Sequence, residues 1–310
     1  MRFVAVLCAL AASLATFSAQ AETWRFALIG DTPYSDYERR ELPAMIEAIA
    51  AEHVDLIVHA GDFKHSKDAC SDALFEDRRA LFEASPVPFI YVPGDNEWSD
   101  CGRLSAGRFD PQERLRRLRD VFFAGEASLG QKRIALQRPA GDFREHRRWR
   151  LGPVLFASLN VPGGNNNYQL TGEASAEAIA RMPQVLDWLR ESFAIARRER
   201  LPGIVVVMQA NPGLGFFASG LAVGGYRELL ETLRAETLAF PGQVLLVHGD
   251  THWQRIDQPL RDPASGRRLA NFTRVETFGY PFMGWVKAFI DTGSPTLFRF
   301  EAHGWPRPAR

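Results

Sequence analysis

The chain has 310 residues, of which 46% are hydrophobic and 24% are charged, and its 37 basic residues balance its 37 acidic ones. This balance excludes a strong overall attraction to nucleic acid or to a membrane surface, so a charged partner has to be recognised locally. No internal repeat, long linker or low-complexity block interrupts the sequence, and its length suits one α/β domain.

The first 21 residues have the features of a cleaved signal peptide. Arg2 supplies a positive charge, residues 3–17 are almost unbroken apolar sequence, and Ala19-Gln20-Ala21 is the small-x-small pattern that signal peptidase reads. The alternative is a membrane anchor, but the apolar stretch is shorter than the roughly 20 residues of a spanning helix. We therefore expect cleavage before Glu22, a periplasmic or secreted protein without a membrane span, and a single domain over residues 22–310.

Short β-branched runs alternate with amphipathic segments along most of the chain, which is typical of a layered α/β fold. The predicted strands are residues 24–29, 54–60, 88–92, 154–160, 203–208 and 243–248. Predicted helices lie between them, with apolar faces formed by Leu42, Met45, Ile46 and Ile49, by Leu74, Leu81 and Phe82, and by Leu115, Leu118 and Phe122, and with two more helices over residues 179–198 and 226–238.

The character of the sequence changes after His252, because long helical patterns are absent there. Residues 268–277, 286–291 and 296–301 have the pattern of antiparallel strands. We expect this tail to complete a second sheet.

Two of the three cysteines remain after signal cleavage, because Cys8 lies in the signal peptide. An even number of cysteines in an oxidising compartment favours pairing, so we predict a disulfide between Cys70 and Cys101. The alternative is two free buried thiols. A bridge would join two loops at one end of the sheet.

Four predicted strands end in glycine followed by aspartate, at Gly30-Asp31, Gly61-Asp62, Gly94-Asp95 and Gly249-Asp250. In an open parallel sheet such strand ends lie along one edge, where ligands bind, and glycine lets the backbone turn sharply there. One pair of this kind is an ordinary turn or helix cap. Four pairs predict four converging carboxylates, whose mutual repulsion a multivalent cation would relieve.

At these positions the sequence resembles the calcineurin-like metallophosphoesterases, whose signatures are GDxH, GD, GNH[DE], a later histidine and GHxH. The corresponding segments are, in order, Gly30-Asp31-Thr32-Pro33, Gly61-Asp62, Gly94-Asp95-Asn96-Glu97, Gln209 and Gly249-Asp250-Thr251-His252. Their order and spacing match across almost the whole mature chain. The resemblance implies an α/β fold of the four-layer α/β/β/α sandwich type, with two facing mixed sheets flanked by helices and a two-metal centre at the strand ends.

The resemblance also implies the ligands of the metal centre. It makes Asp31 and Asp62 metal ligands, with Asp62 bridging two metals, and it gives His252 to the first metal. Pro33 stands in place of a ligand histidine and cannot bind metal. The other departures keep oxygen donors, since Asp95 replaces an asparagine and Gln209 and Asp250 replace histidines.

These replacements change the chemistry of the predicted site in one direction. Imidazole-rich sites suit zinc and iron, whereas carboxylate and amide oxygens suit magnesium, manganese or calcium. We therefore expect one or two divalent cations of the harder kind, Mg²⁺, Mn²⁺ or Ca²⁺, rather than zinc or iron.

The predicted site lacks the usual proton donor of the family, because Asn96 stands where a histidine protonates the leaving group. Asn96 has no useful pKa for that role. The other candidates for acid–base chemistry are Glu97 and His248, with His65 a further one, although His248 at the end of an apolar strand is more typical of a buried structural histidine.

Three residues are candidates for substrate binding. Lys64 is a point charge for a phosphate or a solvated side chain, His65 follows it, and Asn211 lies near the predicted metals. His59, inside its strand, is expected in the core.

Three further features are left open by the sequence. Residues 161–168 contribute amide contacts to a substrate or form only a polar turn. Residues 144–150 are a basic patch, for which a solvated surface is favoured over a nucleic-acid site. Trp98 and Trp253 wall the pocket or serve in packing.

We therefore predict metal-dependent hydrolysis of a phosphate mono- or diester, small or macromolecular, at a dinuclear or degenerate mononuclear site. The alternative is an exported binding module that keeps the fold, with or without a structural cation, and has lost turnover. The missing proton donor favours the alternative, whereas the retained aspartates favour the enzyme.

Overall fold

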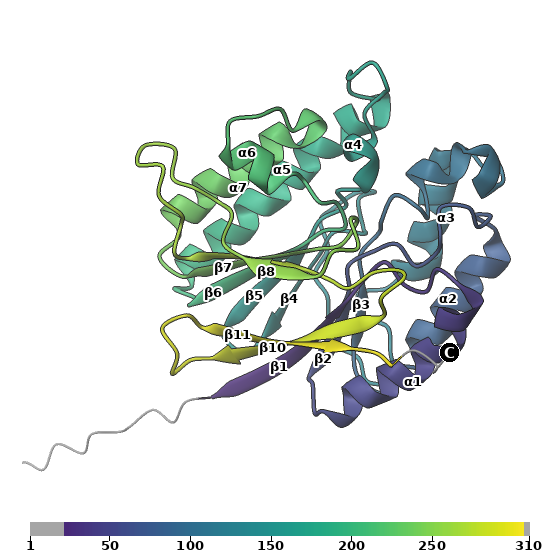
Figure 1. Cartoon of the computed structure of the whole chain (residues 1–310), viewed down its shortest axis with the longest axis horizontal. Coiled ribbons are helices and arrows are strands. Elements are labelled where there is room, and N and C mark those ends of the chain that lie inside the picture. Colours follow the sequence, from purple (N-terminus) through teal and green to yellow (C-terminus); the bar gives the residue numbers. More distant parts are fainter. Residues whose placement is uncertain (1–21, 307–310) are drawn as a thin grey trace, which may run out of the picture.

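A computed structural model describes residues 22–306 of the chain, and the predicted signal peptide lies outside the described residues. Two sheets lie face to face, and helices cover their outer faces (Figure 1). This arrangement confirms the predicted four-layer α/β/β/α sandwich.

The first sheet has the strand order β11-β10-β1-β2-β3. Its parallel part is β1 (Thr23–Ile29), β2 (Leu56–His59) and β3 (Phe89–Tyr91). On the other side of β1, β10 (Gly284–Asp291) and β11 (Phe298–Gly304) continue the sheet in antiparallel pairing.

The second sheet has the strand order β4-β5-β6-β7-β9-β8. Its central strands β5 (Val154–Ser158), β6 (Gly203–Val207), β7 (Gln243–His248) and β9 (Phe272–Glu276) are parallel. The edge strands β4 (Arg147–Leu151) and β8 (Arg255–Asp257) are antiparallel to their neighbours.

The helices fall into two groups on the outer faces. The first sheet is covered by α1 (Asp36–Ala51), α2 (Asp72–Glu83) and α3 (Pro111–Phe122). The second is covered by α5 (Ala176–Arg198) and α7 (Arg227–Ala239), with the short α6 (Leu214–Ala218) beside them. Short turns of helix lie in the loops: α4 (Gly163–Asn167), η1 (Ser99–Gly102), η2 (Leu104–Ala106) and η3 (Gly224–Tyr226).

The central strands contribute alternate side chains to two of three hydrophobic cores, one between the sheets and one under each group of helices. Phe26 and Leu28 of β1 face the core between the sheets, whereas Ala27 and Ile29 face the helices. This follows from the two-residue period of a strand, and apolar residues on both faces are typical of parallel strands covered on both sides. The same alternation in β6 places Val205 between the sheets and Ile204 under the helices.

The tail and the basic patch differ from their predictions. The tail does not complete one sheet, because β8 and β9 join the second sheet while β10 and β11 join the first, and β9 is parallel to β7. The predicted solvated patch at residues 144–150 instead contains β4, in which Arg147 and Arg148 are buried. Arg147 donates a hydrogen bond to the Phe123 carbonyl, whereas its Nε and Nη1 are buried without a partner. Arg148 donates to the Ser192 hydroxyl and pairs with Glu191.

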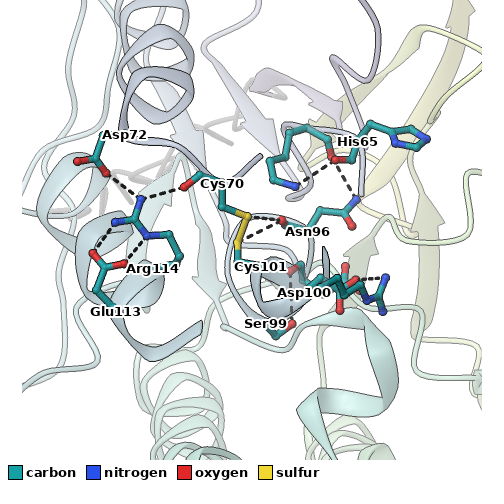
Figure 2. The surroundings of a disulfide bond; sticks show 12 residues. His65, Cys70, Asp72, Asn96, Ser99, Asp100, Cys101, Glu113 and Arg114 are labelled. Carbon is teal, nitrogen blue, oxygen red and sulfur yellow. Dashed lines mark hydrogen bonds and ion pairs between the residues drawn. A yellow bond between two sulfur atoms is a disulfide. The ribbon is translucent and has the colours of Figure 1, made fainter. Parts of the chain in front are cut away.

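The predicted disulfide joins Cys70, in the loop before α2, to Cys101 in η1, with 5.8 Å between the Cα atoms. Figure 2 shows that the bridge lies against Asn96, whose carbonyl oxygen is 3.5 Å from the Cys70 Sγ and 3.7 Å from the Cys101 Sγ. The bridge thus supports the loop that follows β3.

Within residues 22–306, no helix combines the length and the apolar character needed to cross a membrane.

Candidate metal centre

The structure brings the four predicted aspartates together at the carboxyl ends of strands in both sheets. Asp31, Asp62 and Asp95 follow β1, β2 and β3 and are buried, and Asp250 follows β7 and is partly buried. The backbone N–H of Asp250 donates to both carboxylate oxygens of Asp31, at 3.1 and 3.0 Å, which joins the two sheets at this point.

Left-handed backbone conformations shape the turns that carry these side chains. Asp31, Asp62 and Asp250 have φ angles of 48°, 59° and 80°, and His252 has a φ of 59°. Such conformations are uncommon for residues other than glycine, and they gather at functional sites when the surrounding structure holds them. All four residues are in the predicted ligand set.

Burial and mutual repulsion raise the pKa values of the carboxyl groups. For Asp31 the pKa is raised first by burial and then by the charge of Asp250. The pKa of Asp62 is raised by burial and then by Asp95, and that of Asp250 rises to about 7 for the same two reasons. The four carboxylates therefore lie within electrostatic reach of one another and need a counter-charge to ionise together at neutral pH.

Asp62 is held by two side chains that belong to neighbouring loops. Its Oδ2 accepts hydrogen bonds from the Tyr34 hydroxyl at 2.8 Å and from Asn96 Nδ2 at 2.9 Å, and its Oδ1 accepts from the Asn96 backbone N–H at 3.1 Å. Tyr34 is not among the site residues predicted from the sequence. Its position directly after the Gly30-Asp31-Thr32-Pro33 segment is the signal that could have indicated it.

The loop after β5 approaches the aspartates with its backbone. The N–H of Gly163 donates to Gln209 Oε1 at 2.6 Å, and a side chain at position 163 would place its Cβ 2.8 Å from Asp250 Oδ1 and 2.9 Å from Asp95 Oδ2. Only glycine fits such a contact. Within residues 161–168, α4 therefore lies against the candidate metal centre. Its residues Gly164, Asn165 and Asn166 have left-handed backbone conformations.

His252 is oriented toward Asp31. Its Nδ1 lies 2.7 Å from the carbonyl oxygen of Tyr280, which can only accept, so Nδ1 carries the proton. Its Nε2 lies 3.7 Å from Asp31 Oδ1, and burial lowers the pKa of the ring. A neutral imidazole with a free Nε2 lone pair is the form that binds metal, and a carbonyl on the other nitrogen is the usual partner.

Glu97 braces the loops of the site. Its Oε1 accepts from the backbone N–H of Asp62 at 3.0 Å, from that of Gly94 at 2.7 Å and from the Tyr91 hydroxyl at 2.5 Å. Burial raises the pKa of Glu97. Its Oε1 positions the turns after β2 and β3, whereas its Oε2 is buried without a hydrogen-bond partner.

Two predicted functional residues have positions that suit structural roles. Lys64 is buried and donates to the His65 carbonyl at 3.0 Å, so its ammonium is not presented to solvent as a solvated or phosphate-binding group would be. His248 is also buried, with Nδ1 against the Gly249 carbonyl, and burial lowers its pKa to about 3. This placement matches the structural alternative for His248, and a neutral ring with that pKa is a poor proton donor at neutral pH.

The remaining predicted residues divide between the site and the core. The Asn211 N–H donates to Asp250 Oδ2 at 2.8 Å, and the His65 ring contacts Tyr34 at a centroid distance of 5.6 Å. His59 is in the core, as expected, and Trp98 is buried. Trp253 is exposed.

The chemistry of this donor set fits a hard divalent cation, although the side chains do not form a ready-made site. Among residues 22–306, no three His, Cys, Asp or Glu side chains meet closely enough to enclose a metal ion. Four carboxylates that repel one another in a buried setting nevertheless need positive charge to be ionised together at neutral pH. The residues that would hold a cation are Asp31, Asp62, Asp95, Gln209, Asp250 and His252, which supply mostly oxygen.

Comparisons with known proteins agree with this geometry. The chain matches the calcineurin-like phosphoesterase family over residues 25–254. It superposes on a dimetal phosphatase from Danio rerio with a TM-score of 0.56 and 15% identity, covering 91% of this chain and 96% of that one. A structure of PhoD gives a TM-score of 0.56 with 12% identity, covering 90% of this chain and 68% of that one.

A purple acid phosphatase from yellow lupin (Lupinus luteus) seeds gives a TM-score of 0.51 with 13% identity, covering 91% of this chain and 52% of that one. A search of curated proteins gives no match. The likeness to the three solved structures shows a shared fold. The family match spans most of the sequence, and the chain belongs to the calcineurin-like phosphoesterase family.

Proposed function

We propose that this chain is a metal-dependent hydrolase of phosphate mono- or diesters. The observation that carries the proposal is the convergence of four aspartates, each at the end of a different strand, in a buried site. Phosphoester hydrolysis is the activity of the family, and the superposed proteins include a dimetal phosphatase and a purple acid phosphatase.

A bound divalent cation would supply Lewis-acid activation of the phosphoryl group and of an attacking water. Asp31, Asp62, Asp95 and Asp250 would hold it, with Gln209 and His252 as further donors. The chain's own residues keep these donors in place: Glu97 fixes the turns after β2 and β3, and the Tyr280 carbonyl fixes the tautomer of His252.

The proton donor for the leaving group is the weak part of the site. Asn96 has no proton to give at neutral pH, and its amide is occupied with Asp62, Tyr34 and the Lys64 carbonyl. General acid help is typically worth about 10² to 10⁴ in rate. We therefore expect good leaving groups to be cleaved much faster than poor ones.

The test is a screen of p-nitrophenyl phosphate and bis-p-nitrophenyl phosphate with Mg²⁺, Mn²⁺, Ca²⁺ and Zn²⁺, with Asp62→Asn as the inactive control. Hydrolysis that needs a divalent cation and is lost in Asp62→Asn supports the proposal. Activity that survives Asp62→Asn identifies a contaminant. Silence with every metal overturns the proposal in favour of a binding module that keeps the fold.

The identity of the metal is measured separately. We propose that Mg²⁺, Mn²⁺ or Ca²⁺ binds in preference to zinc or iron, because five of the six proposed donor side chains offer oxygen. Elemental analysis of protein purified without added metal checks this. Stoichiometric zinc or iron would overturn the preference and leave the hydrolase proposal standing.

We also propose that the protein is exported, either to the periplasm or into the medium. The Cys70–Cys101 disulfide supports this, because such bonds persist in oxidising compartments. The intact mass of the protein from the extracytoplasmic fraction is the measurement. We expect a mature chain that begins at Glu22, and retention of residues 1–21 would contradict cleavage.

A further inference from the structure

Four aromatic rings form a connected cluster beside the candidate metal centre. The Tyr34 ring contacts His65, His252 and Tyr280 at centroid distances of 5.6, 5.1 and 6.0 Å, and His65 contacts Tyr280 at 6.1 Å. Tyr34 and Tyr280 are stacked with 25° between their planes, and the other three contacts are edge-to-face. We call this set the four-ring cluster.

The four-ring cluster runs from the buried carboxylates to the protein surface. At its inner end Tyr34, 8% exposed, donates its hydroxyl hydrogen bond to Asp62. At its outer end Tyr280 is 39% exposed. A ligand whose phosphate is held by a cation at the carboxylates could therefore extend its organic part along these rings.

Tyr280 is fixed relative to the proposed metal ligands by its own backbone. Its N–H donates to the carbonyl of Asp31 at 3.2 Å, and its carbonyl accepts from His252 Nδ1 at 2.7 Å. Gly279 makes this approach possible, because a Cβ there would lie 2.8 Å from Asp31 Cβ and 2.9 Å from the His252 ring. The Tyr280 ring also packs against Tyr34 and His65, and a ring restrained in this way loses little conformational entropy when a ligand packs on it.

We propose that the four-ring cluster binds a planar aromatic ring in the organic part of the phosphate ester. The substrate class is then phosphate esters that carry an aromatic ring in their organic part, such as nucleotides and esters of benzylic or phenolic alcohols. Stacked and edge-to-face contacts stabilise an aromatic ring beyond the area it buries, and an aliphatic ring of equal size lacks this gain. This inference rests on the proposed function for the phosphate position.

The experiment compares benzyl phosphate with cyclohexylmethyl phosphate, each as the monoester and as its methyl diester. Both alcohols are primary and similar in size, but benzyl alcohol is the more acidic leaving group, so ring recognition is read from KM and from phosphonate binding rather than from kcat. We expect KM to be roughly 2- to 10-fold lower for the benzyl ester. Equal KM values for the two esters overturn the inference.

Two variants of one residue then assign the preference to the cluster. Tyr280→Ala should abolish the preference for the benzyl ester, whereas Tyr280→Phe, which keeps the ring, should retain it. Phe216→Ala is the control, because Phe216 is an exposed ring (62%) on α6 that lies outside the cluster. A preference that survives Tyr280→Ala overturns the inference, provided the variant keeps the melting temperature of the wild type.

The kcat/KM values of adenosine 5′-monophosphate and ribose 5-phosphate are compared, in whichever ester type is cleaved. This comparison distinguishes a nucleobase from a smaller aromatic alcohol as the source of the ring. A preference for the first shows that a nucleobase is accepted. A preference limited to the benzyl ester assigns the cluster to smaller aromatic alcohols. Either result supports an aromatic ring as the recognised group.

Calorimetry with benzylphosphonate and cyclohexylmethylphosphonate gives a readout that needs no turnover. Tighter binding of benzylphosphonate by a chain that hydrolyses nothing would sustain the ring site and overturn only the hydrolase. Hydrolysis of both esters at the same rate, with equal binding of both phosphonates, would overturn the ring site and sustain the hydrolase.

Discussion

The Tyr34 hydroxyl donates a 2.8 Å hydrogen bond to Oδ2 of Asp62, the carboxylate that the family pattern assigns to both metals. Asn96 Nδ2 donates to that hydroxyl at 2.8 Å and to the same carboxylate oxygen at 2.9 Å, which closes a triangle of polar groups. The site thus offers Asp62 hydrogen-bond donors in addition to any cation. Tyr34 also carries the inner ring of the four-ring cluster, so one residue connects the carboxylates to the proposed ring site.

Tyr34→Phe should lower the free energy of unfolding of the metal-free protein by about 1–3 kcal/mol, because the buried carboxyl group of Asp62 loses a hydrogen-bond donor. Saturating Mn²⁺ should restore most of this loss by supplying positive charge to Asp62. Urea denaturation with EDTA and with Mn²⁺ measures both quantities. Tyr37→Phe is the matched control, because it removes the hydrogen bond from Tyr37 to the Pro306 carbonyl near the C-terminus. Equal losses with and without Mn²⁺ would contradict a cation at Asp62.

Asp250 predicts how the stability of the metal-free protein depends on pH. Burial and the charge of Asp95 raise its pKa from 3.8 to about 7, so between these values the folded chain holds a proton that the unfolded chain has released. The free energy of unfolding should therefore fall as pH rises from about 4 to 7, by on the order of a few kcal/mol, and stay low above that range.

Urea titrations in EDTA from pH 5 to pH 8 test this dependence. Asp250→Asn should flatten the curve, since the amide does not titrate. Saturating Mg²⁺ should reduce the loss above pH 7, because a cation stabilises the ionised carboxylates. The same slope in wild type and in Asp250→Asn would assign the effect to other groups.

Much of the fold could be predicted because its central strands carry their signal locally. Except for β9, each parallel strand is a short apolar run followed by glycine and aspartate or by a polar turn, and β6 is buried over its whole length. β8 has no such signal, because it is three residues long and mostly exposed at the sheet edge. The division of the tail between the two sheets depends on which strands pair. β10, near the end of the sequence, pairs with β1, near its beginning, so this pairing joins segments that are far apart in the sequence.

The same contrast explains what was missed in the site. The four aspartates could be predicted because each follows a local motif. Gly163 and Tyr280 could not, because they matter only through contacts made by folding: Gly163 with Gln209, and Tyr280 with Asp31. The sequence predicts a solvated surface for the buried arginines of β4 because their partners lie on segments distant in sequence.

The Cys70–Cys101 bridge should contribute to stability and to the order of the Asn96 loop. Replacing both cysteines by serine should lower the free energy of unfolding by about 2–4 kcal/mol, since the bridge closes a loop with a sequence separation of 31. Amide exchange in residues 95–101 should accelerate, because both sulfur atoms contact the Asn96 carbonyl. A reductant should bring the wild type to the level of the variant and leave the variant unchanged. If the wild type and the variant have the same free energy of unfolding, and reductant changes neither, the bridge contributes nothing to stability.

Asn96→His tests whether the missing proton donor limits the rate. If an imidazole at this position protonates the leaving group, the gain should be largest for phenyl phosphate, which has a poorer leaving group than p-nitrophenyl phosphate. General acid catalysis is worth about 10² to 10⁴. We expect at least a roughly tenfold rise in the ratio of kcat for phenyl phosphate to kcat for p-nitrophenyl phosphate, because part of the gain is offset by the tight packing of Asn96 against Asp62 and the disulfide.

Asn96→Ala separates proton donation from loss of the amide. Both variants remove the hydrogen bonds from Asn96 Nδ2 to Asp62 and Tyr34, but only the histidine can donate a proton near neutral pH. A rise in the leaving-group ratio with histidine and not with alanine assigns the effect to proton transfer, and it should disappear above the pKa of the new imidazole. The same ratio in both variants would mean that release of Asp62 from the Asn96 amide, rather than acid catalysis, sets the rate.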